Sequence, residues 1–123
     1  MKRIALFCII VLLFSGCASF VDNTYKTLYV AGQAYDAGMK TIADLQAQGK
    51  ITEAQRAEIN SYANKFYVSY QAAASALSTY NKTKTAADED KLAVAITELI
   101  RSWKVYAQAA NTLLPGIVPV EVN

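Results

Sequence analysis

Apolar residues recur at steps of three and four along most of the chain, which is the spacing of one face of a helix. In the first such stretch they are Leu28, Ala31, Tyr35, Met39, Ile42 and Leu45. Gly49 follows this stretch, and glycine readily takes the left-handed conformation that closes a last helical turn. The pattern predicts a helix over about residues 24–48.

The next stretch has a stricter, seven-residue spacing. One row consists of Ile59, Phe66, Ala73 and Tyr80, and its companion row of Ala63, Tyr70 and Leu77. Such rows describe a coiled-coil-like seam. Thr52 and Gln55 have the spacing of a capping box, in which each side chain accepts a backbone N–H at the start of a helix. We expect a helix over about 53–81, antiparallel to the first because the connection is short.

A third stretch repeats the seven-residue spacing. Its rows are Leu92, Leu99, Tyr106 and Leu113, and Ile96, Trp103 and Ala110. Thr85 is placed to cap its start, and Pro115 with Gly116 ends it, which predicts a helix over about 86–114. The remaining residues 115–123 are apolar, and we expect this tail to lie extended against the bundle or a partner, because a free apolar tail would be an exposed liability.

These elements predict an all-α fold, an antiparallel three-helix bundle over residues 24–114. The chain has 123 residues, of which 54% are hydrophobic. That length suits one small domain, and the apolar fraction is too high for a disordered chain.

The first sixteen residues have the order of a targeting segment. Lys2 and Arg3 precede an apolar run over residues 4–14. As a helix this run would span only about 16 Å, against a hydrocarbon core of about 30 Å. We interpret residues 1–16 as a cleavable signal helix; the alternative is an uncleaved N-terminal helix.

The run ends in Phe14-Ser15-Gly16-Cys17, which resembles the lipobox of bacterial lipoproteins, Leu-(Ala/Ser)-(Gly/Ala)-Cys, with Phe14 in the place of leucine. The resemblance covers only this N-terminal segment. It implies cleavage between Gly16 and Cys17, and a Cys17 that carries diacylglycerol and usually a third, amide-linked chain such as palmitate. Two or more acyl chains anchor a protein stably. Residues 17–23 would then be a short lipidated tether.

The residues after Cys17 bear on location. In Gram-negative lipoproteins an aspartate there retains the protein in the inner membrane, whereas this chain has Ala18. The resemblance therefore implies the cell envelope, with the periplasmic face of the outer membrane favoured if the source is Gram-negative. Cys8 would leave with the signal, so the mature chain would hold no disulfide.

The charge pattern changes once the signal is removed. The formal net charge of +2 comes from 12 Lys and Arg against 10 Asp and Glu, and the basic count includes Lys2 and Arg3. The predicted mature chain is therefore neutral in its side chains. Lys82 and Lys84 are the only close basic pair outside the signal, so we do not expect nucleic-acid binding.

The residue types also limit the chemistry. The chain has no histidine, which excludes the usual zinc sites and the Ser–His and Cys–His catalytic pairs. Glu53 and Glu98 are expected to pair with Arg56 and Arg101 on helix surfaces. No glutamate stands alone in an apolar stripe, where its pKa would be raised for general-acid work. We expect no catalytic residue, no cofactor, no small-molecule substrate and no enzyme.

Two further groups of residues have alternative interpretations. Asp88, Glu89 and Asp90 suit the start of a helix, where negative charge is favoured; the alternative is a divalent cation site, but consecutive carboxylates point around a helix rather than converging. Of the eight tyrosines, some fall on core seams, where packing is expected. Tyr29 and Tyr67 lie off the seams, where packing at the rim competes with binding a protein or a glycan.

These observations predict a membrane-anchored, non-enzymatic envelope lipoprotein that acts as a structural or protein-interaction module, through a protein partner or through self-association. In size and helical pattern the chain resembles small helical lipoproteins of bacterial and prophage genomes. Self-association predicts an uncovered helix face and an uncovered tail from Ile117. The alternative is a ligand-binding or inhibitory module, against a wall-degrading enzyme or an incoming phage, with exposed aromatics on one face away from the tether. A lysis or toxin-like activity would need a helix that is apolar all round or strongly basic on its polar face, and no predicted mature helix has either property.

Overall fold

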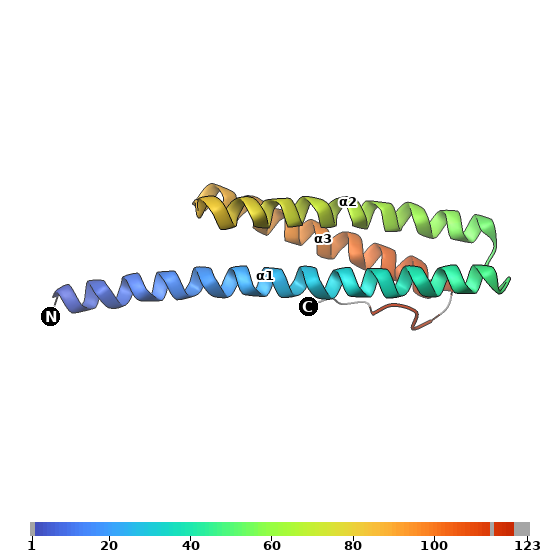
Figure 1. The fold of residues 1–123 in the computed structure, drawn as a ribbon, viewed down its shortest axis with the longest axis horizontal. Helices are drawn as coiled ribbons and strands as arrows, with labels where there is room; N and C mark the ends of the chain where they lie inside the picture. Colours follow the sequence, from blue (N-terminus) through green and yellow to red (C-terminus); the bar gives the residue numbers. More distant parts are fainter. Residues whose placement is uncertain (1, 114, 120–123) are drawn as a thin grey trace.

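The computed structural model describes residues 2–113 and 115–119, with side chains described from Ser19 onward. The helices are α1 (Lys2–Ala47), α2 (Glu53–Thr83) and α3 (Ala86–Leu113), and the described part of the chain contains no strand. Figure 1 shows α2 and α3 running antiparallel beside each other, with α1 along the pair. The prediction of an all-α, three-helix protein is confirmed.

The first helix begins earlier than the apolar pattern predicted. The expected start was near Thr24, but the described residues Ser19 to Asn23 already belong to α1. This segment contains neither proline nor glycine, and the Phe20 ring packs edge-on against Tyr80 of α2 at a centroid distance of 6.1 Å. The part of the predicted tether that is described is therefore a packed turn of helix. Residues 1–16 and Cys17 lie outside the part of the chain whose side chains are described.

The predicted helix ends are present. Gly49 has φ +70° and lies just beyond α1. At the start of α2 the backbone N–H of Gln55 donates to Thr52 Oγ1 at 3.1 Å, and the N–H of Thr52 donates to Gln55 Oε1 at 2.9 Å, which completes the capping box. At the start of α3 the N–H of Asp88 donates to Thr85 Oγ1 at 3.2 Å.

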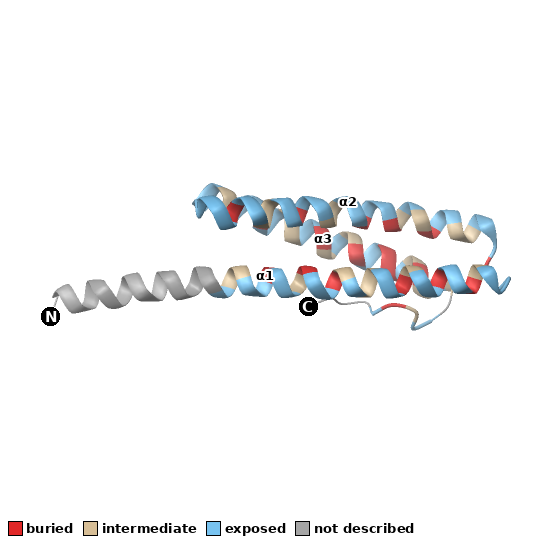
Figure 2. Ribbon diagram, in the orientation of Figure 1, coloured by how far each residue is buried: buried red, intermediate tan, exposed pale blue. Residues whose placement is uncertain are grey.

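Most of the buried residues lie on the predicted rows, although Tyr70, Leu77, Ile96 and Leu113 of those rows are only partly buried and the buried Ala107 lies on neither row. On α2 and α3 the buried residues are Ile59, Ala63, Phe66, Ala73, Tyr80, Leu92, Leu99, Trp103, Tyr106, Ala107 and Ala110. Figure 2 shows these buried positions on the facing sides of the helices. Phe66 meets Trp103 edge-on at 5.1 Å between ring centroids, and Trp103 meets Tyr106 in the same manner at 5.3 Å. These three rings, together with Tyr35 of α1, form what we call the aromatic core.

Glycines let α1 approach the tyrosines of the other helices. A Cβ atom at Gly38 would lie 2.9 Å from the Tyr106 hydroxyl and 2.6 Å from Cγ1 of Val118. A Cβ atom at Gly32 would lie 3.0 Å from the hydroxyl of Tyr70. A glycine inside a helix costs about 1 kcal/mol relative to alanine. At Gly38 the glycine is needed despite this cost, because any larger residue would keep α1 from packing closely over the core.

The described part of the C-terminal tail, residues 115–119, also joins the core. Gly116, at φ +82°, turns the chain back towards the helices, and Val118 is buried. Asn111 holds Val118 through both backbone groups, at 3.0 and 3.2 Å, and the Trp103 indole N–H donates to the carbonyl of Pro119 at 2.9 Å. The prediction was an extended tail over residues 115–123, but residues 115–118 form turns and bends, and residues 120–123 lie outside the described residues.

Candidate functional site

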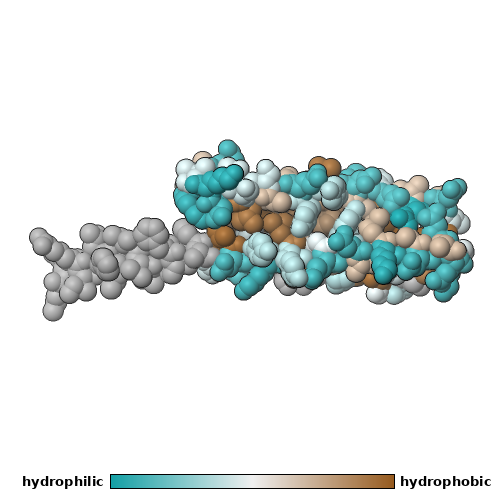
Figure 3. Space-filling view, in the orientation of Figure 1, coloured by the Kyte–Doolittle hydropathy of each residue, from teal (hydrophilic) through white to brown (hydrophobic). Residues whose placement is uncertain are grey.

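A shallow apolar groove runs between α1 and α2 near the α2–α3 turn. Its volume is about 540 Å³, and we call it the α1–α2 groove. Its lining residues are Val21, Asp22, Tyr25, Leu28, Tyr29, Tyr70, Ala74, Leu77, Ser78 and Asn81. Figure 3 shows apolar surface gathered between the two helices in this part of the molecule.

The groove has an apolar floor and an aromatic rim. Leu28 and Leu77 contribute to the apolar surface, while Tyr25 is 63% and Tyr29 is 56% exposed. The Tyr29 hydroxyl accepts a hydrogen bond from Gln33 Nε2 at 2.9 Å, which orients that ring on the helix surface. The groove therefore offers tyrosine rings beside an aliphatic surface.

Packing at the α2–α3 turn fixes the end of this groove. The contact between Phe20 and Tyr80 brings the turn of α1 that contains Phe20 beside the last turn of α2. Lys84 adopts a left-handed conformation with φ 52°, and its ammonium lies 5.3 Å from the centroid of the Tyr80 ring. The same ammonium donates to Asn81 Oδ1 at 2.9 Å. This end of the groove is thus held by side-chain contacts as well as by the turn.

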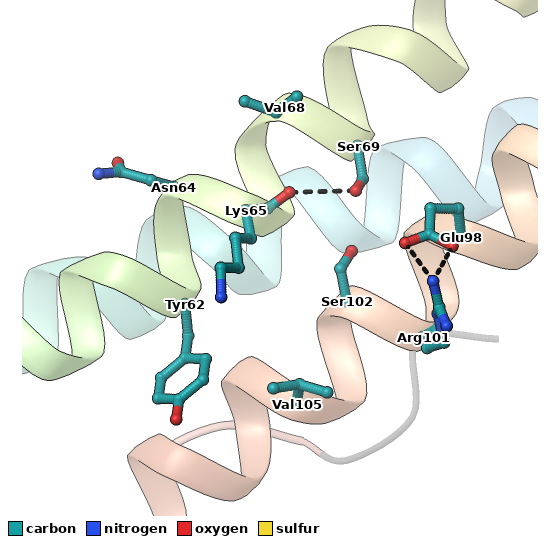
Figure 4. Close-up of a pocket in the computed structure, with 9 residues that line it drawn as sticks. All are labelled: Tyr62, Asn64, Lys65, Val68, Ser69, Glu98, Arg101, Ser102 and Val105. Atoms are coloured by element: carbon teal, nitrogen blue, oxygen red, sulfur yellow. Dashed lines mark hydrogen bonds and ion pairs between the residues drawn. The ribbon is translucent and has the colours of Figure 1, made fainter.

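A second groove lies between α2 and α3, and we call it the α2–α3 groove. It has a volume of about 600 Å³ and is lined by Tyr62, Asn64, Lys65, Val68, Ser69, Glu98, Arg101, Ser102 and Val105 (Figure 4). Val68 is 65% and Val105 is 42% exposed. The Lys65 ammonium lies 5.7 Å from the centroid of the Tyr62 ring. This groove combines exposed valines with charged side chains.

The predicted pairing of the surface glutamates is half right. Arg101 binds both carboxylate oxygens of Glu98, at 2.8 and 2.6 Å, as its three-residue spacing predicted. The predicted pair of Glu53 with Arg56 is wrong, because Arg56 Nε donates to Asn60 Oδ1 at 3.1 Å instead. Asn60 lies one turn further along α2, where it competes with the carboxylate for the guanidinium.

The acidic cluster at the start of α3 serves the helix end. Thr83 Oγ1 and Thr85 Oγ1 donate to the Asp88 carboxylate at 2.6 and 2.9 Å, and these two hydrogen bonds hold its pKa below the usual value. Lys91 pairs with the same carboxylate at 3.4 Å. Among the residues that the structure describes, no group of three acidic or cysteine side chains converges in a way that could hold a metal ion.

The tyrosines divide between core and surface. Tyr29 and Tyr67 are exposed, as their positions off the seams predicted, while Tyr106 is fully buried. The Tyr106 hydroxyl has no hydrogen-bond partner in the described part of the molecule, and burial raises its pKa to about 12. Sequence reasoning missed this buried hydroxyl, since the seven-residue spacing shows that a ring is buried but not what its hydroxyl meets.

The residues predicted for cleavage and lipidation, Gly16 and Cys17, lie outside the part whose side chains are described. Comparison with family models, curated proteins and solved structures finds no match. Of the helices in the described residues, none is both long and apolar enough to cross a membrane.

Proposed function

We propose that this protein is a lipid-anchored, non-enzymatic envelope lipoprotein that acts as a structural or protein-interaction module. The observation that carries the proposal is the lipobox-like sequence Phe14–Cys17, placed three residues before Phe20, which packs on the bundle. A lipid chain on Cys17 would hold the bundle directly at the membrane surface. By the same resemblance, the periplasmic face of the outer membrane is the proposed location in a Gram-negative source.

The α2–α3 groove is the surface we assign to a protein partner. Its lining residues come only from α2 and α3, in the middle of both helices. Val68 and Val105 offer exposed apolar contact, and Tyr62 and Arg101 are of the residue types enriched at protein interfaces.

The position of the exposed aromatics favours this proposal over an inhibitory module. That alternative predicted aromatic residues clustered away from the tether. Of the three exposed tyrosines, only Tyr67 lies on the middle of α2, whereas Tyr25 and Tyr29 flank the α1–α2 groove, within about 20 Å of Cys17 along the axis of a helix. Self-association through the tail is disfavoured as well, because Val118 is buried within its own bundle.

The anchor is tested by replacing each of the two cysteines. We expect Cys17→Ser to abolish palmitate labelling and to leave an unprocessed or released protein. Cys8→Ser is the matched control, because Cys8 lies in the segment that would be removed, and it should be labelled like the wild type. Unchanged labelling of Cys17→Ser would overturn the proposal.

The partner surface is tested by photo-crosslinking in the native envelope. A photoreactive residue in place of Val105, in the α2–α3 groove, should give a discrete crosslinked protein. The same residue in place of Thr41, on the exposed face of α1, is the control. Equal crosslinking from both positions would contradict the assignment of this groove.

A further inference from the structure

We infer that the α1–α2 groove is a lipid-contacting surface, which seats the bundle on the membrane at a defined tilt. The inference rests on the proposed lipidation of Cys17, and it goes beyond that anchor in naming which face of the folded domain meets the bilayer. Its occupant is the interfacial layer of the membrane, where headgroups meet acyl chains.

The groove begins close to Cys17 along α1. Val21, Tyr25 and Tyr29 lie four, eight and twelve residues after Cys17, which corresponds to about 6, 12 and 18 Å of helix rise. Each headgroup layer of a bilayer is about 5–8 Å thick. With acyl chains on Cys17 in the hydrocarbon, Val21 therefore lies in or beside the headgroup layer. Tilting α1 towards its groove side brings the two tyrosines into the same layer.

The residues of the groove have the chemistry of a membrane interface. Its rim carries the exposed rings of Tyr25 and Tyr29, and its surface includes Leu28, Ala74 and Leu77. Tyrosine is enriched at membrane–water interfaces because its apolar ring and polar hydroxyl match the two sides of that layer. The α2–α3 groove matches this layer less well, because Lys65 and the Glu98–Arg101 pair lie in it, whereas Asp22 is the one charged residue among the described residues that line the α1–α2 groove.

This end of the bundle is held in a fixed position relative to α1. The Phe20–Tyr80 contact fixes α2 against the turn of α1 that contains Phe20, so the groove cannot swing freely about Cys17. A surface joined to an anchor by about one turn of packed helix meets the membrane at a high effective concentration. A weak affinity of the groove for lipid is then enough to set the orientation.

The charges near the groove predict how the contact depends on lipid type. Lys26, Lys82, Lys84 and Lys91 lie at this end of the bundle, together with Asp22, Asp88, Glu89 and Asp90. The two signs balance, so attraction to anionic lipid contributes little. We therefore expect the contact to persist in vesicles made only of zwitterionic lipid.

The experiment places a fluorescent label in each groove of the lipidated protein. Tyr25→Cys and Val105→Cys each add one free thiol, because Cys17, the other cysteine of the mature chain, is blocked by lipid. Both proteins are labelled with an environment-sensitive fluorophore and reconstituted into phosphatidylethanolamine–phosphatidylglycerol vesicles, and again into phosphatidylcholine vesicles. Brominated lipids then report which label lies at the membrane.

We expect brominated lipid to quench the label at position 25 several-fold more strongly than the label at position 105, in both kinds of vesicle. Equal, weak quenching at the two positions would overturn the inference. A label at position 25 that is shielded from water but not quenched by lipid would also overturn it, because a protein or a second copy would then cover the groove. Failure of the proposed function has a different readout, since the purified protein would carry no lipid on Cys17.

Discussion

The aromatic core and the α1–α2 groove are both built on the face that α1 shares with its neighbours, but only the core is closed. Val118 of the tail covers the core around Trp103 and Tyr106, and Gly38 lets α1 pack closely against Tyr106. Nearer the α2–α3 turn no tail residue among those described covers Tyr25 or Tyr29, which remain more than half exposed. The comparison indicates that folding depends on the middle of the bundle, and that the apolar groove is free to serve binding.

The largest expected difference between the two regions comes from truncating one aromatic residue in each. Trp103→Ala should lower the free energy of unfolding by about 3–5 kcal/mol, because it opens a cavity in the core and removes the hydrogen bond to Pro119. Tyr25→Ala should change it by no more than about 0.5 kcal/mol, as is usual for an exposed side chain. Urea unfolding followed by far-ultraviolet circular dichroism measures both. Similar losses would show that the groove is part of the folding core.

The two helical glycines sharpen the same comparison. Gly38→Ala should destabilise the protein by about 1–3 kcal/mol, because the new methyl group would overlap Val118 and the Tyr106 hydroxyl. Gly32→Ala meets only the outer end of the half-buried Tyr70 side chain, which can move. There the better helix propensity of alanine should leave stability unchanged or raise it by up to about 1 kcal/mol. Thermal unfolding of the pair is the test, and a larger loss at Gly32 would contradict the packing described.

Removing the unpartnered Tyr106 hydroxyl should increase the free energy of unfolding. Tyr106→Phe should raise stability by about 1 kcal/mol at neutral pH, because the buried hydroxyl has lost its bonds to water without replacement. The folded-state pKa is about 12 against an ordinary value of 10.0, so the unfolded chain ionises first. Wild-type stability should therefore fall as pH rises from 10 towards 12, and the variant should lack this part of the fall.

Unfolding experiments across this alkaline range distinguish the variant from the wild type. Tyr29→Phe, which removes an exposed hydroxyl, is the control and should follow the wild-type curve. If the stability of Tyr106→Phe also followed the wild-type curve, this would contradict a Tyr106 hydroxyl that is buried without a hydrogen-bond partner.

The smallest expected difference between the two regions is that of the helix caps, one at each end of the bundle. Thr52→Ala and Thr85→Ala should each cost about 1 kcal/mol, since each removes a side-chain acceptor for a backbone N–H. These costs should be alike at the two ends because capping is local, unlike the core and groove substitutions. Chemical unfolding of the two variants checks this, and a loss above about 2 kcal/mol at either end would mean that the cap also supports tertiary packing.

Much of the helical architecture could be predicted from the sequence, because it depends on local spacing. The row through Phe66 on α2 is buried as predicted, and so is the row through Leu99 on α3 apart from the partly buried Leu113; the bounds of both helices agree within two residues. The capping box at Thr52 was also readable, since its two partners are three residues apart.

The features that could not be predicted depend on contacts between distant segments. No local pattern shows that Val118 would fill the space at Gly38, or that the Tyr106 hydroxyl would end there without a partner. The prediction that Arg56 pairs with Glu53 was wrong for a similar reason. Spacing gives the possible partners of a long side chain but does not show which one it binds. The α1–α2 groove was missed because a surface between two helices depends on how they diverge in space.

The measurement that tests the central claim most directly is the intact mass of the protein purified from its own membrane. We expect a chain that begins at Cys17 and carries the added mass of diacylglycerol, with or without a third acyl chain. A mass equal to the unprocessed chain of 123 residues, or to a chain cut elsewhere and free of lipid, would contradict it.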